Sequence, residues 1–211
     1  MIPALAADER PYFFWLGANQ PHIPLRPEQR WLDLYDEGAI TLDPNFREAP
    51  PEGSIYNQGL PGEAYYRDGT STNNYGETTG GPPRDADTMR RFIKGYYATI
   101  SHLDDQIGRF IAKLKDAGLF ENTVVVFIGD NGYHLGNHGL GNKITMHEES
   151  VRVPMFISGP GVPKGERDGR LVSSLDLFPT LLALAGSEAS YAGPGGDLFG
   201  GVPPRDYVAS E

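Results

Sequence analysis

The stretch Thr123-Val-Val-Val-Phe-Ile-Gly-Asp-Asn-Gly-Tyr-His-Leu-Gly-Asn-His-Gly-Leu-Gly-Asn-Lys143 contains the most informative pattern of the sequence. Its first six residues are β-branched, aromatic or aliphatic, and they predict a buried strand that ends at Ile128. Asp130 and Asn131 follow almost at once, and ligands of open α/β sheets bind beyond the carboxyl ends of strands. Because carboxylate and amide oxygens suit calcium or magnesium, the stretch predicts a metal-binding loop after a strand.

Two other interpretations of this loop remain open. Asn131-Gly132 is a favoured dipeptide for the turn of a β-hairpin, which would place a second alternating strand directly after it. The residues that follow are instead rich in glycine and histidine. His134 and His138 have the four-residue spacing of helical zinc ligands, but the nearby glycines disfavour a helix.

The rest of the chain alternates between strand and helix patterns. Residues 87–117 carry an apolar side chain every three or four positions and predict a long helix, and 174–185 predict a short one. The runs 12–17 and 153–158 predict strands, the first of them buried on both faces, and 207–210 predict the start of another. This order favours one α/β domain with a largely parallel central sheet.

Composition narrows the class of protein. The 211 residues carry a formal net charge of −10, which excludes the broad basic face of a nucleic-acid-binding protein. Without cysteine there is no disulfide, zinc–thiolate site or cysteine nucleophile in the chain, and no apolar run approaches the length that spans a membrane. The 27 glycines and 18 prolines predict many loops, above all a long surface excursion at about 36–86.

Two further segments are candidates for the functional site. His22 lies between Pro21 and Pro24, which restrict the backbone and orient the imidazole, although a surface histidine in a tight turn has the same pattern. Thr145 and Glu148 fit a capping box, which would begin a helical turn just after the glycine-rich loop and fix that loop in place.

Four motifs, in the same order along the chain, resemble those of the type I, formylglycine-dependent sulfatases of the alkaline phosphatase superfamily. They are Phe13-Phe-Trp-Leu-Gly17 with Gln20-Pro-His-Ile-Pro24, Tyr96-Tyr-Ala-Thr-Ile-Ser-His-Leu-Asp-Asp-Gln-Ile-Gly108, the loop up to Lys143 with Glu149-Ser-Val-Arg-Val-Pro154, and Ser174-Leu-Asp-Leu-Phe-Pro-Thr-Leu-Leu182. The resemblance implies an alkaline-phosphatase-like sandwich with a largely parallel central sheet and flanking helices. It also implies a sulfuric ester hydrolase.

The same resemblance implies roles for individual residues. Asp130 and Asn131 would be metal ligands, for calcium or alternatively magnesium. Lys143 and His22 would be catalytic and contact the sulfate group, and His138 would belong to the substrate pocket. The substrate would be a sulfated small molecule or polysaccharide, and a periplasmic, secreted or lysosomal location is suggested by the family alone.

The sequence also departs from the family pattern. The family makes its formylglycine nucleophile from the first residue of a Cys/Ser-x-Pro-x-Arg motif, and this chain contains neither cysteine nor a serine in such a motif. The first strand of the family, with its paired metal-binding aspartates, is also absent. We therefore expect residues 1–211 to be a partial catalytic domain, its C-terminal half, which is inactive alone. The alternatives are a phosphodiesterase or phosphonate hydrolase of the superfamily, and a non-catalytic remnant or carbohydrate-binding scaffold.

Overall fold

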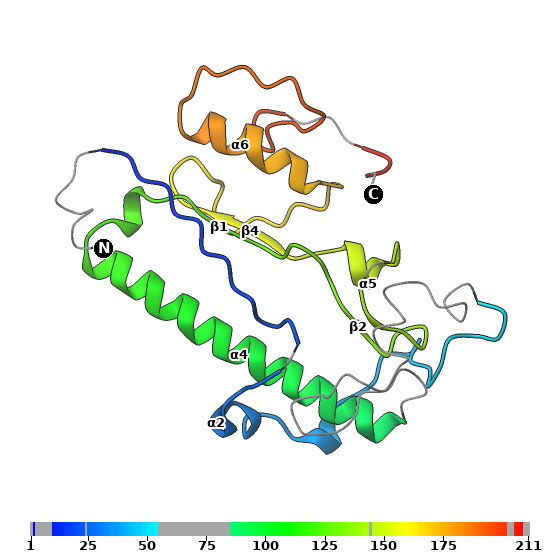
Figure 1. Ribbon diagram of the computed structural model, residues 1–211. Coiled ribbons are helices and arrows are strands. Elements are labelled where there is room, and N and C mark those ends of the chain that lie inside the picture. The colour runs from blue at the N-terminus through cyan, green and yellow to red at the C-terminus, as the bar shows by residue number, and fades with distance from the viewer. Residues whose placement is uncertain are drawn as a thin grey trace. The chain divides into compact units, whose positions relative to one another are not determined.

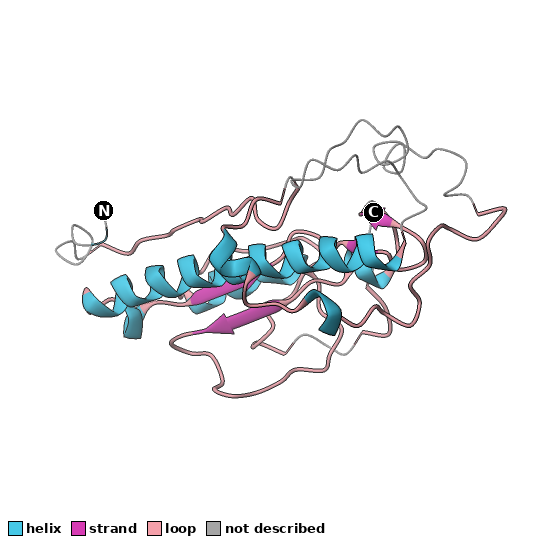
Figure 2. Cartoon of the chain, turned by 90° about the horizontal axis from the view of Figure 1, so that it is seen from below, coloured by secondary structure: helices cyan, strands magenta, loops and turns pink. Residues whose placement is uncertain are grey.

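The computed structural model describes residues 2, 10–23, 25–54, 85–143, 145–201 and 205–208. Its elements, in chain order, are α2 (Gln29–Leu32), η1 (Glu37–Ala39), α4 (Ala86–Asp116), η3 (Phe120–Asn122), β1 (Val125–Ile128), β2 (His134–Leu135), β3 (Gly141–Asn142), α5 (Glu148–Val151), β4 (Met155–Ser158), η4 (Ser174–Asp176) and α6 (Leu177–Leu184) (Figure 1). Loops and turns connect these elements, as the glycine and proline content predicts (Figure 2).

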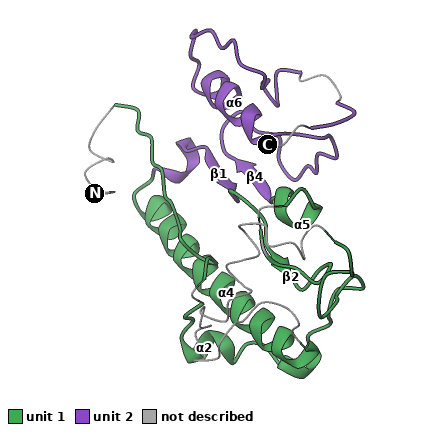
Figure 3. Ribbon diagram, turned by 45° about the vertical axis from the view of Figure 1, so that its right-hand side comes forward, with its two compact units in different colours: residues 1–118, 130–153 green, residues 119–129, 154–211 purple. Residues whose placement is uncertain are grey.

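The chain divides into two compact units (Figure 3). The first consists of Met1–Gly118 and Asp130–Val153, and the second of Leu119–Gly129 and Pro154–Glu211. Within the described residues, none of the helices combines the length and apolar character needed to cross a membrane.

Helix α4 dominates the first unit and confirms the long helix predicted from periodicity. The Asp85 carboxylate caps its start by accepting a hydrogen bond of 2.7 Å from the Thr88 backbone N–H. After the helix ends, Gly118 adopts a φ of 69°, which a glycine tolerates without strain. Short helix α2 packs beside α4.

The core of the first unit lies along the N-terminal half of α4. Five buried residues form it: Leu25, Ile40, Met89, Phe92 and Ile93. Phe46 and Leu135 pack against this cluster. Part of the predicted excursion at 36–86 therefore belongs to the body of the unit, while its residues 55–84 lie outside the described part of the chain.

Strands β1 and β4 form the small sheet of the second unit. They pair antiparallel, with Phe127 opposite Phe156 and Val125 opposite Ser158. The parallel central sheet is thus not confirmed, because both sheets of the described residues are two-stranded and antiparallel. A parallel pair needs a crossover connection, usually through a helix, whereas the described residues between 129 and 154 contain only the four-residue α5 as helix.

The predicted strand at 12–17 is wrong for this structure. The segment has no strand assignment, and Phe13 and Trp15 are 76% and 81% exposed. Phe14 makes an edge-to-face contact with Phe110 of α4, with ring centroids 6.1 Å apart. A strand exists only when a neighbour accepts its backbone hydrogen bonds, and no described segment pairs with this one.

Helix α6 and the short η4 before it confirm the helix predicted at 174–185. Ser173 and Asp176 form a capping box at the start. The carboxylate of Asp176 is fully buried and accepts two hydrogen bonds from the Arg205 guanidinium, at 2.6 and 2.7 Å. This ion pair connects Arg205 of the C-terminal segment to Asp176 at the start of α6. Residues 207 and 208 form no strand, and the rest of the strand predicted there lies outside the described residues.

Candidate functional site

The Asp130-Asn131-Gly132 turn follows β1 and packs against α5. Asp130 is exposed, and its carboxylate accepts a hydrogen bond of 3.0 Å from the Asn131 backbone N–H. The Gly132 N–H donates to the Ser150 carbonyl at 2.8 Å. A Cβ on Gly132 would lie 2.0 Å from the Glu149 carbonyl oxygen, so glycine is required at this position. The turn thus presents two oxygen-bearing side chains from a tightly packed backbone.

Strands β2 and β3 form a small hairpin that ends next to Lys143. His134 pairs with Asn142, and Leu135 with Gly141. The hairpin reverses the chain, so Lys143 leaves it at the end where residue 133 enters. The alternative in which Asn131-Gly132 connects two paired strands is wrong, because β2 pairs with β3 and β1 pairs with β4.

The alternative of a helical zinc site is also wrong. His134 belongs to a strand, and His138 follows it in a turn with a positive φ of 58°. No group of three or more histidine or acidic side chains among the described residues is arranged to hold a metal ion. The two oxygen donors of the Asp130-Asn131 pair therefore remain the metal-ligand candidates from the sequence.

His134 is the most buried polar side chain of the hairpin, at 1% exposure. Its Nε2 lies 2.8 Å from the Thr145 hydroxyl, whereas its buried Nδ1 has no hydrogen-bond partner among the described residues. The pKa of His134 is lowered to about 4, mainly by burial; the nearby His147 and His138 contribute to the lowering, and Glu149 opposes it. The imidazole is therefore neutral at pH 7.

His138, Glu149 and Asn45 form a polar cluster beside the hairpin. The Glu149 carboxylate accepts a hydrogen bond of 2.9 Å from the Asn45 amide nitrogen and lies 3.2 Å from His138 Nε2. The same Asn45 nitrogen is 3.3 Å from His138 Nε2, and Asn137 donates to the Asn45 side-chain oxygen at 2.9 Å. Burial raises the pKa of Glu149, but its hydrogen bonds and the two histidines lower that pKa more, so the net shift favours the carboxylate.

Sequence reasoning did not find all members of this cluster. Asn45 lies in the predicted surface excursion, and no local pattern marks it. The capping box proposed for Thr145 is wrong, because α5 begins at Glu148 with His147 as its N-cap. The Thr145 hydroxyl instead accepts a hydrogen bond from the His147 backbone N–H at 3.3 Å. The His147 ring stacks on His138, with centroids 4.5 Å apart.

His22 is exposed and follows the segment at 12–17 through a cis Gln20–Pro21 peptide bond. Its Nδ1 is hydrogen-bonded to the carbonyl of Ile23. Among the described residues no hydrogen bond or ion pair joins His22 to Lys143. The convergence of these two side chains on one site therefore stays a prediction.

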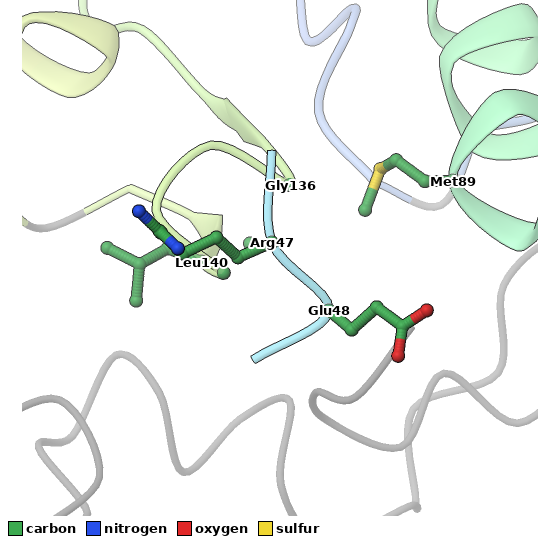
Figure 4. Close-up of a pocket in the computed structure, with 7 residues that line it drawn as sticks. Arg47, Glu48, Met89, Gly136 and Leu140 are labelled. Carbon is green, nitrogen blue, oxygen red and sulfur yellow. The ribbon is translucent and has the colours of Figure 1, made fainter. Parts of the chain in front are cut away.

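A small cavity lies next to the hairpin turn (Figure 4). The residues that line it are Arg47, Glu48, Met89, Leu140 and the glycines at 136, 139 and 141. Its volume of about 10 Å³ is close to the least that holds one water molecule, so it is a packing gap and no substrate pocket.

The sequence of the chain matches a known protein family. The sulfatase family model matches residues 1–187. The chain belongs to the sulfatase family. A sulfatase of Formosa agariphila is 32% identical over 187 residues, which cover 86% of this chain and 34% of that protein. Human iduronate 2-sulfatase is 28% identical over an alignment that covers all of this chain and 40% of the relative.

The chain is also similar to a solved structure. The phosphonate monoester hydrolase of Silicibacter pomeroyi has a TM-score of 0.68 and 26% identity, and the match covers 89% of this chain and 37% of that one. The chain thus spans about a third to two fifths of the length of these relatives.

Proposed function

We propose that this chain forms part of the catalytic domain of a sulfuric ester hydrolase and provides its metal-binding turn and part of its sulfate site. The proposal is carried by one loop, from Asp130 to Lys143, which begins with two oxygen donors and returns as a hairpin to a lysine. Family membership supports this function. The name of the human relative, iduronate 2-sulfatase, supports a sulfated carbohydrate as substrate.

The Asp130 and Asn131 side chains suit calcium by their chemistry. Both offer hard oxygen atoms on a turn whose backbone is held against α5. Calcium takes about six to eight oxygen ligands, so two side chains form only part of a site, with magnesium as the alternative ion. When bound, the ion would neutralise negative charge on the sulfate group. We propose that the remaining ligands come from other parts of the whole protein.

Lys143 and His22 are proposed to act on the sulfate ester itself. Cleavage places an attacking oxygen on sulfur and releases the alcohol oxygen, while negative charge is spread over the sulfuryl oxygens. The Lys143 ammonium would stabilise that charge. The His22 imidazole would contact the sulfate and donate a proton to the leaving oxygen. The formylglycine nucleophile of the family has no counterpart in this chain, so we propose that the chain alone is inactive.

The test is activity of the whole protein toward a chromogenic aryl sulfate. Lys143→Ala and His22→Ala, made separately, should each lower kcat/KM by about 10²-fold or more while the fold is retained. Lys164→Ala, at an exposed lysine of the second unit, is the matched control and should leave kcat/KM unchanged. Retention of most activity by either site variant would remove that residue from the site.

Phosphonate monoester hydrolysis is the second candidate, favoured by the similarity to the Silicibacter pomeroyi enzyme. Asn131 argues for the sulfatase activity, because related phosphodiesterases and phosphonate hydrolases often have Asp-His where this chain has Asp130-Asn131. Parallel assays with an aryl sulfate and an aryl phosphonate monoester at equal concentration compare the two activities. We expect the larger kcat/KM with the sulfate.

A further inference from the structure

Three segments of the chain meet at one carboxylate, and one of them is far from the other two in the sequence. The Glu149 carboxylate of α5 accepts a hydrogen bond of 2.9 Å from the Asn45 amide nitrogen, which is 104 positions away. The same carboxylate oxygen lies 3.2 Å from Nε2 of His138 in the hairpin turn. Asn45 also accepts a hydrogen bond from Asn137, across 92 positions. The Glu149 side chain is 22% exposed and that of His138 is 37% exposed, so both are partly shielded from water. Each segment therefore depends on the other two for its polar partners.

Backbone hydrogen bonds place the same segments against each other. The His138 N–H donates to the Asn45 carbonyl at 3.0 Å, and the Arg47 N–H donates to the Gly136 carbonyl at 3.1 Å. A Cβ on Gly139 would lie 2.1 Å from the Ala49 backbone. The turn at 136–139 thus has little room to move when its side-chain bonds are intact.

His138 is the residue of this turn that most needs external support. Among the described residues, His138 is the one non-glycine residue that has a positive φ, which is 58°. A non-glycine residue persists in this region only when its surroundings hold it there. The contacts of its imidazole with Glu149 and Asn45, together with the stacked His147 ring, are side-chain interactions that support it here. The hairpin continues from this turn to Lys143, so the same contacts determine where Lys143 is presented.

We propose that Glu149 is a positioning residue of the sulfatase: its carboxylate, held by Asn45, fixes the His138 turn and thereby the position of Lys143 relative to the metal-binding turn. This inference rests on the proposed function for its catalytic consequence. Its structural part stands on the contacts of the chain alone. The interaction depends on the kind of side chain at each position, because the Glu149 carboxylate bonds to the Asn45 amide and both contact the His138 imidazole.

A charge swap tests the proposal. Glu149→Gln removes the carboxylate, and Asn45→Asp places a second carboxylate next to the first. Each single variant should raise amide hydrogen exchange of residues 134–143 about tenfold in the 211-residue chain. The double variant N45D/E149Q restores an amide–carboxylate pair with the carboxylate still near His138, so it should return to within about threefold of the wild type.

Glu148→Gln is the matched control, because this neighbouring carboxylate is 76% exposed and, among the described residues, forms its ion pair with Arg152, which directly follows the helix. It should leave the exchange of 134–143 unchanged. In the whole protein the single variants should lower kcat about tenfold at nearly constant KM, with the double variant recovering.

The outcomes separate the two levels of the proposal. Exchange that is unchanged in both single variants, or that is not restored by the swap, overturns the positioning role. Exchange that follows the prediction in a protein that hydrolyses no sulfate ester upholds the positioning of the turn and refutes the proposed function instead. A uniform rise of exchange over α4 as well as 134–143 would indicate global destabilisation and would also overturn the specific role.

Discussion

Replacing His134 should remove much of the acid sensitivity of the fold. The imidazole is 1% exposed. Among the described residues, no group is placed to accept a hydrogen bond from a protonated Nδ1. Its pKa is about 4 in the folded chain and about 6.5 for an ordinary histidine. The unfolded chain therefore takes up a proton on His134 between pH 6.5 and 4, while the folded chain does not.

The sign and size of the effect follow from this difference. The stabilising contribution of neutral His134 is complete above pH 6.5 and decreases as the pH falls toward 4. Each pH unit in that window is worth about 1.4 kcal/mol, so the free energy of unfolding should fall by about 3 kcal/mol from this residue alone. Below pH 4 both states are protonated, and the loss stops growing.

The assay is urea unfolding of the chain at several pH values between 7 and 4, for the wild type and for His134→Gln. The wild type should lose about 3 kcal/mol more than the variant across this range. His22→Gln, at an exposed histidine outside the cluster, is the control and should follow the wild-type curve. NMR titration of the His134 ring gives the pKa directly. Parallel stability curves for wild type and H134Q, or a His134 pKa near 6.5, would refute the reasoning.

Four other substitutions test the packing and the metal-binding turn. Gly139→Ala should cost more than about 3 kcal/mol because its Cβ would meet backbone at 2.1 Å, whereas Gly165→Ala, with a similar positive φ and open space, should cost about 1 kcal/mol by urea unfolding. Arg205→Ala should cost about 3 kcal/mol because it leaves the buried Asp176 carboxylate without its cation; a loss under 1 kcal/mol contradicts this. Asp130→Ala should weaken calcium binding of the whole protein at least tenfold in calorimetry, and unchanged affinity would exclude this ligand.

Local patterns in the sequence determined the elements whose formation depends on neighbours along the chain. The three- to four-residue periodicity of 87–117 predicted α4 to within one residue at each end. The β-branched run ending at Ile128 predicted β1, and the apolar stretch at 174–185 predicted η4 and α6. Helical hydrogen bonds and caps join residues three or four positions apart, so composition and spacing are sufficient to predict them.

The four family motifs also lie within the sequence, and they led to the sulfatase family that the comparison confirms. The proposed metal ligands, Asp130 and Asn131, and the proposed sulfate-binding Lys143 came from one such motif. These residues are close in sequence, so the loop that carries them could be predicted as a unit. The convergence of His22 on the same site depends on contacts between distant segments and stays a prediction.

Only the tertiary structure decided which distant segments become partners. Nothing local distinguishes Asn45 from other polar loop residues, yet it bonds to Glu149 across 104 positions. The direction of the β1–β4 pair is likewise invisible in either strand alone, because both orientations use the same β-branched residues. The run at 12–17 has every local property of a buried strand and is not one, since a strand also requires a paired neighbour. Periodicity depends on adjacent residues, whereas pairing and burial depend on where the whole chain brings its segments together.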